Sequence, residues 1–288
     1  GLTCMNEIDS LQLILLNIGY AVHQADWNYK NVKSPFARIY LVKEGSARLH
    51  LPNKRIQVLE PNHLYMIPPF TLHSYECNDY FVLYYMHIYE NQTTSYCVLE
   101  DLMYPVEISA TTIDQLLVER LYKINPDSAL NHYDPSKYDN TSHLISSINY
   151  QTHKPNYAML ETKGILFQLL TRFMVHSRNK YDVVDDRILQ VIRHIRKNID
   201  KQISIEELLD ICCLSKDHFI RLFKKDMHVT PIQYINQKKI ERAQLMLLTS
   251  NQSIKDIAYD LSFENVNYFN RLFKRTTGLT PSNYRLQL

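Results

Sequence analysis

The sequence lacks the features of a membrane protein or of a disulfide-linked secreted protein. No apolar run reaches the roughly 18 residues of a membrane span. The longest candidate, LQLILLNIGYAV from Leu11, follows Glu7 and Asp9 instead of basic residues, which argues against a signal peptide. The cysteines are odd in number, form no Cys-x-x-Cys and have no zinc-ligand spacing. We therefore expect a cytoplasmic protein without membrane contact. The cysteines are Cys4, Cys77, Cys97, Cys212 and Cys213.

The closing stretch of the chain, LSFENVNYFNRLFKRTTGLTPSNYR, contains no apparatus for catalysis. It has no glycine-rich loop, no cysteine–histidine pair and no cluster of carboxylates. Arginine, lysine and asparagine recur instead on one side of a predicted helix, with aromatic residues on the other side. The pattern raises the question of which partner such a helix contacts.

Length and charge both indicate two domains. Residues 1–185 carry 15 Lys/Arg and 19 Asp/Glu, whereas residues 186–288 carry 17 and 11. A basic segment joined to an acidic one is typical of a nucleic-acid-binding module attached to a different domain. The polar stretch at residues 176–187 marks the boundary. We expect domains over residues 1–180 and 186–288.

A segment of the basic part is duplicated. Ser215–Ile235 and Asn265–Arg285 are identical at eight of 21 aligned positions, where chance gives about one. Each copy reads as helix–turn–helix. The segment at residues 232–248 between them predicts a helix long enough to join the copies rigidly.

The helix starts of the two copies carry the expected capping signals. Ser204 with Glu207, and Ser253 with Asp256, form Ser-x-x-acid patterns that predict a capping box before the first helix of each copy. Each copy is followed by a Thr-Pro pair, which predicts an N-cap and a first-turn proline of a further helix. These pairs are Thr230-Pro231 and Thr280-Pro281.

The second helix of each copy has an apolar face that we expect to be core. Its residues are Phe219, Leu222 and Phe223 in the first copy and Tyr268, Phe269, Leu272 and Phe273 in the second.

The opposite face of these helices carries the candidate DNA-binding residues. Arginine can pair with guanine and asparagine with adenine, while lysine neutralises phosphate. A merely solvated face is the weaker interpretation, because both copies keep Arg and Lys at the same helical positions. The candidates are Lys216, Asp217, Ile220, Arg221 and Lys224 in the first copy and Val266, Asn267, Asn270, Arg271 and Lys274 in the second.

The second copy also contains Ile-x-x-Ile-Ala, a Phe in the turn, Tyr-Phe-x-x-x-Phe-Lys, Gly-x-Thr-Pro and Tyr-Arg. These residues are Ile254, Ile257, Ala258, Phe263, Tyr268, Phe269, Phe273, Lys274, Gly278, Thr280, Pro281, Tyr284 and Arg285. With them, the last 85 or so residues resemble the DNA-binding domain of the AraC family of bacterial transcription regulators. The resemblance implies that eight of the candidates above contact bases. They are Lys216, Asp217, Ile220 and Arg221 in the first copy and Val266, Asn267, Asn270 and Arg271 in the second.

Two positions depart from that pattern. Ser262 stands where the family usually has glycine before the turn Phe, and His228 stands where the second copy has Gly278. If position 262 adopts a left-handed conformation, serine costs about 1 kcal/mol there.

Residues 35–90 predict a different architecture. Short apolar segments with Gly, Pro and Asn between them are typical of an all-β barrel or sandwich. Gly45, the Pro68-Pro69 pair and His73-Ser74-Tyr75 are similar to the cupin-type sensor domain that commonly precedes this DNA-binding domain. We predict an α+β protein with two domains. The first is a cupin-like β-barrel with accessory helices, and the second is an all-α domain with two helix–turn–helix units and a linking helix.

Helices are expected after these strands, at about residues 111–124, 140–151 and 157–177. The last has a broad apolar face, which either packs on the barrel or pairs two subunits. The resemblance implies a homodimer. The face consists of Leu166, Leu169, Leu170 and Phe173.

The barrel lacks the histidine pattern of a metal-dependent cupin. His50 has no second histidine two residues away, so we expect no metal, no cofactor and no enzyme activity. Barrel mouths commonly bind small molecules, although each candidate also fits a wall or core role. The candidate effector-binding residues are Trp27, Arg38, Tyr40, His73, Tyr75 and Tyr84.

Together these features predict a sequence-specific transcription regulator that binds double-stranded DNA and responds to a small-molecule effector, such as a sugar or another metabolite. By the habit of the family, it acts as an activator and contacts RNA polymerase. Two alternatives stay open at this point. One is a DNA-binding regulator controlled by a protein partner, and the other is a metal-dependent cupin enzyme with a DNA-binding tail.

Overall fold

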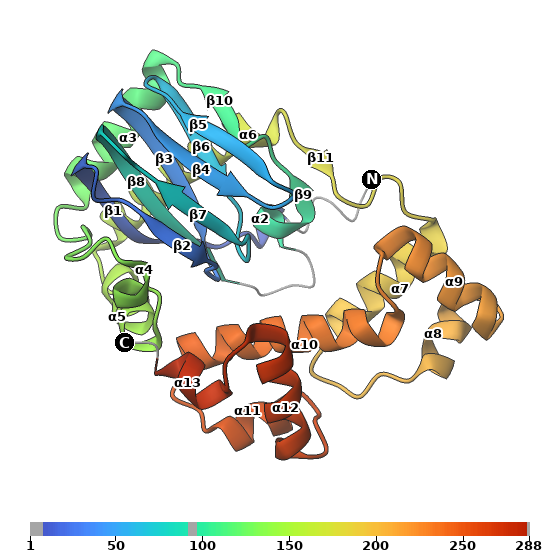
Figure 1. The fold of residues 1–288 in the computed structure, drawn as a ribbon. Helices are drawn as coiled ribbons and strands as arrows, with labels where there is room; N and C mark the ends of the chain where they lie inside the picture. The colour runs from blue at the N-terminus through green and yellow to red at the C-terminus, as the bar shows by residue number, and fades with distance from the viewer. Residues whose placement is uncertain (1–7, 92–96, 287–288) are drawn as a thin grey trace. The chain divides into compact units, whose positions relative to one another are not determined.

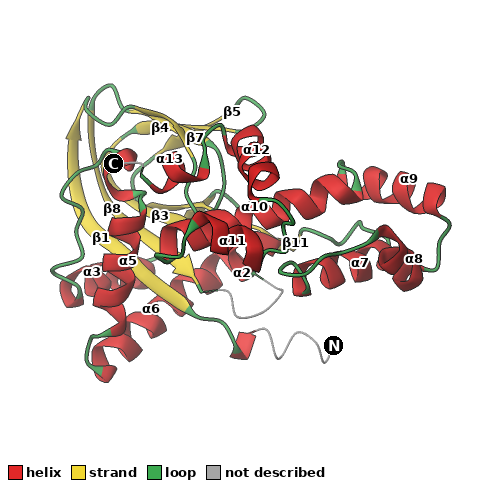
Figure 2. Cartoon of the chain, turned by 90° about the horizontal axis from the view of Figure 1, so that it is seen from below, coloured by secondary structure: helices red, strands yellow, loops and turns green. Residues whose placement is uncertain are grey.

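The computed structural model describes residues 8–91 and 97–286, so Cys4 lies outside the described residues. The chain folds as two compact units, an N-terminal unit that ends at Asn179 and a C-terminal unit that begins at Lys180. Figure 2 shows strands and helices in the first unit and helices alone in the second. The predicted α+β class is therefore confirmed. None of the described helices is both long and apolar enough to cross a membrane.

Two antiparallel sheets form the N-terminal unit. Their strand orders are β1-β8-β3-β6-β10 and β2-β7-β4-β5 (Figure 1). The described strands form two separate sheets and no hydrogen-bonded ring, so the predicted barrel takes the form of a sandwich with one shared core. A further short pair joins β9 to β11. The strands are β1 (Leu13–Gln24), β2 (Tyr29–Val32), β3 (Ala37–Gly45), β4 (Ala47–Leu51), β5 (Arg55–Leu59), β6 (His63–Ile67), β7 (His73–Glu76), β8 (Tyr80–Glu90), β9 (Leu102–Met103), β10 (Glu107–Ser109) and β11 (Arg178–Asn179).

Alternate residues of the central strands fill the core between the sheets. On β8, Phe81, Leu83 and Tyr85 are buried in this core, as the period of two in a strand requires. Tyr40 of β3 and Tyr75 of β7 enter it from the two different sheets. The core between the sheets therefore mixes aliphatic side chains with several aromatic rings.

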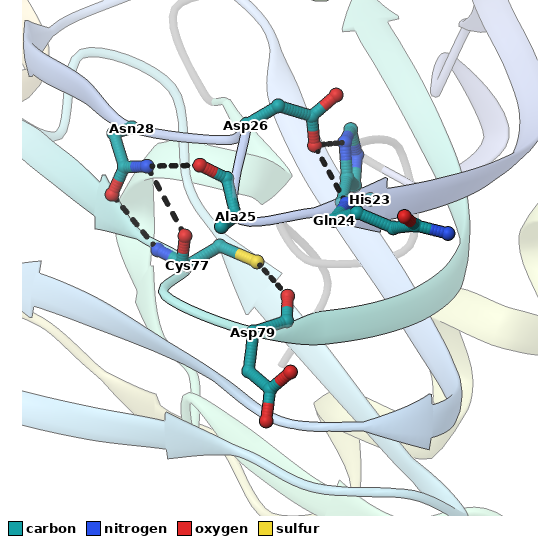
Figure 3. Close-up of polar contacts among 7 residues, drawn as sticks. All are labelled: His23, Gln24, Ala25, Asp26, Asn28, Cys77 and Asp79. Atoms are coloured by element: carbon teal, nitrogen blue, oxygen red, sulfur yellow. Dashed lines mark hydrogen bonds and ion pairs between the residues drawn. The ribbon is translucent and has the colours of Figure 1, made fainter.

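Two loops at one end of the sheets are tied together by Asn28 (Figure 3). Its side-chain amide donates to the carbonyl oxygens of Ala25 and Cys77, at 3.2 and 3.1 Å, and its Oδ1 accepts from the Cys77 amide at 3.0 Å. The Cys77 thiol donates to the Asp79 carbonyl at 3.1 Å. These contacts hold the turn that carries Trp27, which is buried.

Three of the accessory helices, α3, α5 and α6, pack on β1, whereas α4 packs on α5 and α2 packs on β9. The accessory helices are α2 (Val98–Asp101), α3 (Thr112–Ile124), α4 (Pro135–Tyr138), α5 (Thr141–Thr152) and α6 (Asn156–Met174).

The apolar face of α6 belongs to the core of its own unit. Leu166 and Phe173 are both 0% exposed, and α6 packs against α3 and β1. This face is therefore unable to pair two subunits, and the packing alternative left open by the sequence is the one observed. On the outer side of the same helix, Tyr157 and Leu160 are exposed.

In the C-terminal unit, the long helix α10 runs between two groups of shorter helices (Figure 1). Core residues of α7, α8 and α9 pack together with the start of α10, while α11, α12 and α13 pack along the rest of α10. The helices are α7 (Asp186–Lys197), α8 (Ile205–Cys212), α9 (Lys216–Met227), α10 (Pro231–Thr249), α11 (Ile254–Asp260), α12 (Val266–Thr277) and α13 (Pro281–Arg285).

The predicted helix caps are present with one difference. Ser204 and Glu207 form the full reciprocal capping box. At Ser253 only one half forms, since its side chain accepts from the Asp256 amide at 3.0 Å and no return bond is made. Both Thr-Pro pairs cap a helix.

The burial of α6 gives a first prediction. We expect Leu166→Asp to unfold the N-terminal unit, because an unpaired carboxylate in an apolar core costs several kcal/mol. Loss of near-ultraviolet circular dichroism and of cooperative melting would report the unfolding. The matched control is Leu160→Asp on the exposed side of the same helix, which should leave both signals unchanged. Equal melting of the two variants would show that the face of Leu166 is not core.

Candidate nucleic-acid interface

The second helices of the two copies, α9 and α12, expose the faces that the sequence predicted. Phe219 and Phe223 of α9, and Phe269 and Phe273 of α12, are 0% exposed and anchor the inner faces. One core prediction is wrong, because Tyr268 is 42% exposed. It lies in the first turn of α12 and lines a groove between the two halves of the unit.

The outer faces of α9 and α12 present unpaired cations. Arg221 and Lys224 in the first copy, and Arg271 and Lys274 in the second, are exposed. None of the four makes an ion pair within residues 8–91 and 97–286. Arg221 donates from Nε to the Asp217 carbonyl at 3.4 Å, which leaves its terminal nitrogens available for an external acceptor.

The other candidates fall into two groups. Lys216, Asp217 and Asn267 are exposed. Ile220 is half-buried against the core of its own copy, and Val266 is half-buried as well.

Asn270 on α12 has an unsatisfied acceptor. Its Oδ1 is buried and has no hydrogen-bond partner among the described residues. Buried amide oxygens are usually paired. The Asn270 side chain can therefore accept a hydrogen bond from an external donor, or rotate toward the outer face of α12.

The turns of the two copies use left-handed residues at equivalent points. Cys213 (φ 55°) and Ser262 (φ 59°) stand between the helices, and His228 (φ 63°) and Gly278 (φ 84°) end α9 and α12. Position 262 thus has the conformation that favours glycine, and serine tolerates it at a cost of about 1 kcal/mol. The Ser262 hydroxyl offsets part of this by donating to the carbonyl of Asp200 at 2.6 Å.

Lys239 in the middle of α10 connects the two halves. It is only 6% exposed, and its Nζ donates to the carbonyls of Ile199 and Lys201 at 2.8 Å each and of Leu261 at 2.5 Å. Burial lowers the pKa of Lys239 to about 8, and the nearby Asp200 opposes this effect. Ile199 and Lys201 follow α7, whereas Leu261 ends α11. One ammonium group therefore fixes a segment of each half to the linking helix.

Apart from Lys239, the Ser262 hydroxyl joins the halves on this side by its hydrogen bond to the Asp200 carbonyl. A groove of about 490 Å³ separates them beside Lys239, and Gln202 crosses it with one exposed hydrogen bond to Glu264 at 3.2 Å. The angle between α9 and α12 therefore depends on α10, on the Lys239 contacts and on the hydrogen bond between Ser262 and Asp200.

Sequence reasoning missed Lys239. A signal was present, since Lys239 lies one turn after Ile235 and one turn before Ala243, on the apolar stripe of α10. A charged residue on such a stripe has to find buried acceptors. The same device recurs at Arg285, which donates to the carbonyls of Leu247, Ser250 and Gln252.

The candidate effector residues of the N-terminal unit do not all come together. Trp27 and Tyr40 line a small internal cavity of about 20 Å³, which is room for about one water molecule. Tyr75 stacks on Trp27 with ring centroids 4.2 Å apart. Tyr84 lies on the opposite face of its strand, where its ring contacts Tyr20 and Tyr122. The structure therefore brings Tyr84 to α3 and not to the cavity.

His73 and two tyrosines form a buried hydrogen-bond chain. Burial and the charge of Arg38 lower the pKa of His73 to about 3, so the ring is neutral. Its Nδ1 donates to the Thr71 carbonyl at 2.7 Å. Its Nε2 must then accept from the Tyr75 hydroxyl at 2.7 Å, and Tyr75 accepts from Tyr40 at 2.8 Å. Because both ring nitrogens are used, His73 has no lone pair free for a metal. Within residues 8–91 and 97–286, no three His, Cys, Asp or Glu side chains are grouped as metal ligands would be.

The chain shares its C-terminal sequence with known regulators. Residues 208–287 match the family described as "Helix-turn-helix domain". The chain is 38% identical over 95 residues to the "Bifunctional transcriptional activator/DNA repair enzyme AdaA" of Bacillus subtilis, which covers 33% of this chain and 45% of AdaA. The chain thus spans less than half the length of this relative.

Two further similarities extend over most of the chain. The "HTH-type transcriptional activator RhaS" of Mannheimia succiniciproducens is 26% identical over 253 residues, 87% of each chain. The crystal structure of unsaturated fatty acid bound ToxT from Vibrio cholerae is 16% identical and covers 97% of this chain and 96% of its own, with a TM-score of 0.48.

The Lys239 contacts give a second prediction. We expect Lys239→Met to lower the hydrogen-exchange protection of α11 and of residues 199–202 about 5- to 150-fold. The reason is that buried carbonyls left without a donor cost about 1–3 kcal/mol. The control is Lys238→Met, which removes the neighbouring ion pair with Glu241 and the cation–π contact with Tyr234, both within α10, and should change little. The strands of the N-terminal unit serve as an internal reference. Equal protection in the two variants would contradict the role of Lys239.

Proposed function

We propose that this chain, which belongs to the AraC family, is a sequence-specific DNA-binding transcription regulator. In this proposal α9 and α12 enter successive major grooves on one face of double-stranded DNA, about one helical turn apart. Lys224 and Lys274 contact phosphates, and the other candidate residues of α9 and α12 contact bases.

The observation that carries the proposal is the pair of outward arginines. Arg221 and Arg271 occupy equivalent positions on the two duplicated helices, both exposed and both free of internal ion pairs among the described residues. A duplicated solvated surface would have no reason to keep the same unpaired cation twice. Two readers of DNA held by one linking helix would need it in both places.

We further propose that the N-terminal unit senses a small-molecule effector. Support comes from the internal cavity beside Trp27 and Tyr40. Tyr75 and His73 stand next to these residues. We also infer that the regulator acts as an activator, because the name of RhaS includes "transcriptional activator". We propose RNA polymerase as its partner and the cytoplasm as its location.

The proposed homodimer would use the exposed outer side of α3 and α6. These two helices pack on each other and carry Leu116 (58% exposed) and Leu160 (74% exposed). Large apolar side chains that remain exposed on neighbouring helices are typical of protein-interaction surfaces.

A third prediction tests DNA binding. An operator selected from random duplex DNA should be bound less tightly by Arg221→Ala and by Arg271→Ala, each by about 1–3 kcal/mol, with relaxed preference at one base pair. Fluorescence anisotropy of labelled DNA at fixed salt measures both effects. If Arg271→Ala binds its operator as the wild type does, α12 does not read bases there.

The matched control for this experiment is Lys274→Ala on the same helix. It should weaken the operator and unrelated DNA nearly equally and reduce the salt dependence by about one counterion. A base-specific loss in this variant would reverse the assigned roles of Arg271 and Lys274.

A fourth prediction concerns the homodimer. Leu116→Asp combined with Leu160→Asp should convert the dimer to a monomer in sedimentation experiments, since two charges would have to be buried in the interface. The near-ultraviolet circular dichroism should stay unchanged because both side chains are exposed in the single chain. A dimer that persists would place the interface elsewhere.

A further inference from the structure

Arg38 on β3 is a buried cation whose donors are only partly used. Its side chain is 1% exposed. Nη2 donates to the Ser34 hydroxyl at 2.8 Å and to the Tyr138 hydroxyl at 3.4 Å, and the guanidinium lies 4.8 Å from the Phe36 ring centroid. Nε has no hydrogen-bond partner among the described residues. An unpaired buried donor on a charged group is costly, and proteins usually satisfy it.

The counter-charge of Arg38 is indirect. Within the described residues it makes no ion pair with a carboxylate. Asp139 is reached only through Ser34, whose hydroxyl bonds to Asp139 Oδ2. Burial raises the pKa of Asp139 to about 6, although the charge of Arg38 opposes the shift. A direct bidentate carboxylate would suit the guanidinium better than this relayed one.

Arg38 lies next to the internal cavity. Its charge acts on Tyr40, Tyr138 and His87, all of which line that cavity. His73 and His87 both have lowered pKa values because of burial and of Arg38, so neither adds a positive charge. The interior near the cavity thus offers one cation surrounded by aromatic rings.

One segment, residues 130–139, both lines the cavity and carries Asp139, the counter-charge of Arg38. Leu130, Tyr133 and Tyr138 form the cavity walls on one side, and Asp139 follows directly. The segment includes only the short helix α4 and is tied to the sheets by few hydrogen bonds, among them Leu130 N to the Tyr85 hydroxyl at 2.7 Å. Displacing residues 130–139 would enlarge the cavity and free Arg38 at the same time.

We propose that the N-terminal unit binds a small monocarboxylate, whose carboxylate pairs with Nε and Nη2 of Arg38 in place of the Ser34–Asp139 relay. Its apolar or aromatic body occupies the cavity widened by displacement of residues 130–139. This inference rests on the proposed sensor function and names the class of its effector. One negative charge replaces another, so the net charge of the interior stays the same. A phosphate dianion would leave one charge unbalanced.

Displacement of Asp139 would also affect helix α5. Asp139 precedes Asn140, whose side chain caps α5 by accepting from the His143 amide at 3.0 Å. Helix α5 packs on β1. Ligand exchange at Arg38 therefore acts on the start of an accessory helix and is not confined to the cavity.

Trp27 provides a direct probe, since it is the single tryptophan of the chain and lines the cavity. The full-length protein is titrated with matched acid and amide pairs at constant ionic strength: acetate and acetamide, benzoate and benzamide, octanoate and octanamide. Inorganic phosphate is the dianion control. We expect at least one acid to change Trp27 fluorescence saturably and to raise the melting temperature. Its amide and phosphate should do neither.

Two variants locate the effect at Arg38. Asp139→Asn keeps the size of the side chain but removes the competing charge, so the acid should bind at least about 10-fold tighter, or about 1.4 kcal/mol. Arg38→Met should abolish acid binding. If Arg38→Met does not fold, the acid–amide contrast and Asp139→Asn decide. The proposal is overturned if acid and amide bind equally, if no acid binds wild type or Asp139→Asn, or if Asp139→Asn leaves the affinity unchanged.

Operator binding by the same preparations separates this inference from the proposed function. Intact operator binding without any preference for acids would overturn the carboxylate class and leave the regulator function standing. Failure to select any operator would instead contradict the proposed function, whatever the carboxylate titration shows.

Discussion

The ammonium group of Lys239 is the contact on which the arrangement of the C-terminal unit depends. It lies on the buried stripe of α10 and is satisfied by three backbone carbonyls, two after α7 and one at the end of α11. Helix α10 alone would fix the distance between the two halves. The carbonyl contacts also fix their orientation about the axis of α10, because a buried ammonium tolerates no unpaired donor. Two DNA-reading helices can act as one reader only when their relative angle is set in this way.

The two units differ in how far the donors of a buried cation are satisfied by hydrogen bonds. Lys239 donates to three acceptors, whereas the Nε of Arg38 has none among the described residues. The first arrangement gives rigidity, and the second leaves interaction energy available for a partner that supplies a carboxylate. Arg38 is held among aromatic rings with a relayed counter-charge, which is a poor solution for stability alone. Ionisable groups perturbed by burial and by a specific charge partner cluster at functional sites.

The two copies place different residues at equivalent left-handed backbone positions. Gly278 and His228 end equivalent helices in the left-handed conformation, and a side chain added at Gly278 would meet no atom within 4 Å. The space at this position therefore accommodates the histidine of the first copy, which still has the conformational cost of a left-handed backbone. Ser262 has a similar conformational cost inside the second copy, and its hydroxyl bonds to Asp200 across the unit. The departures from glycine are local and leave the helix–turn–helix geometry of both copies in place.

The duplicated helices, most of their caps and the inward phenylalanines could be predicted from the sequence alone. The reason is that periodicity and capping depend on residues three or four positions apart. The sequence also predicted the strand-rich first unit and the helices that follow it. Tertiary structure decided the rest. The apolar face of Leu166 is inside its own unit, Tyr268 borders a groove, Tyr84 faces α3, and Lys239 finds carbonyls 22 to 40 residues away. A local pattern shows which residues share a face, but what covers that face depends on segments distant in the chain.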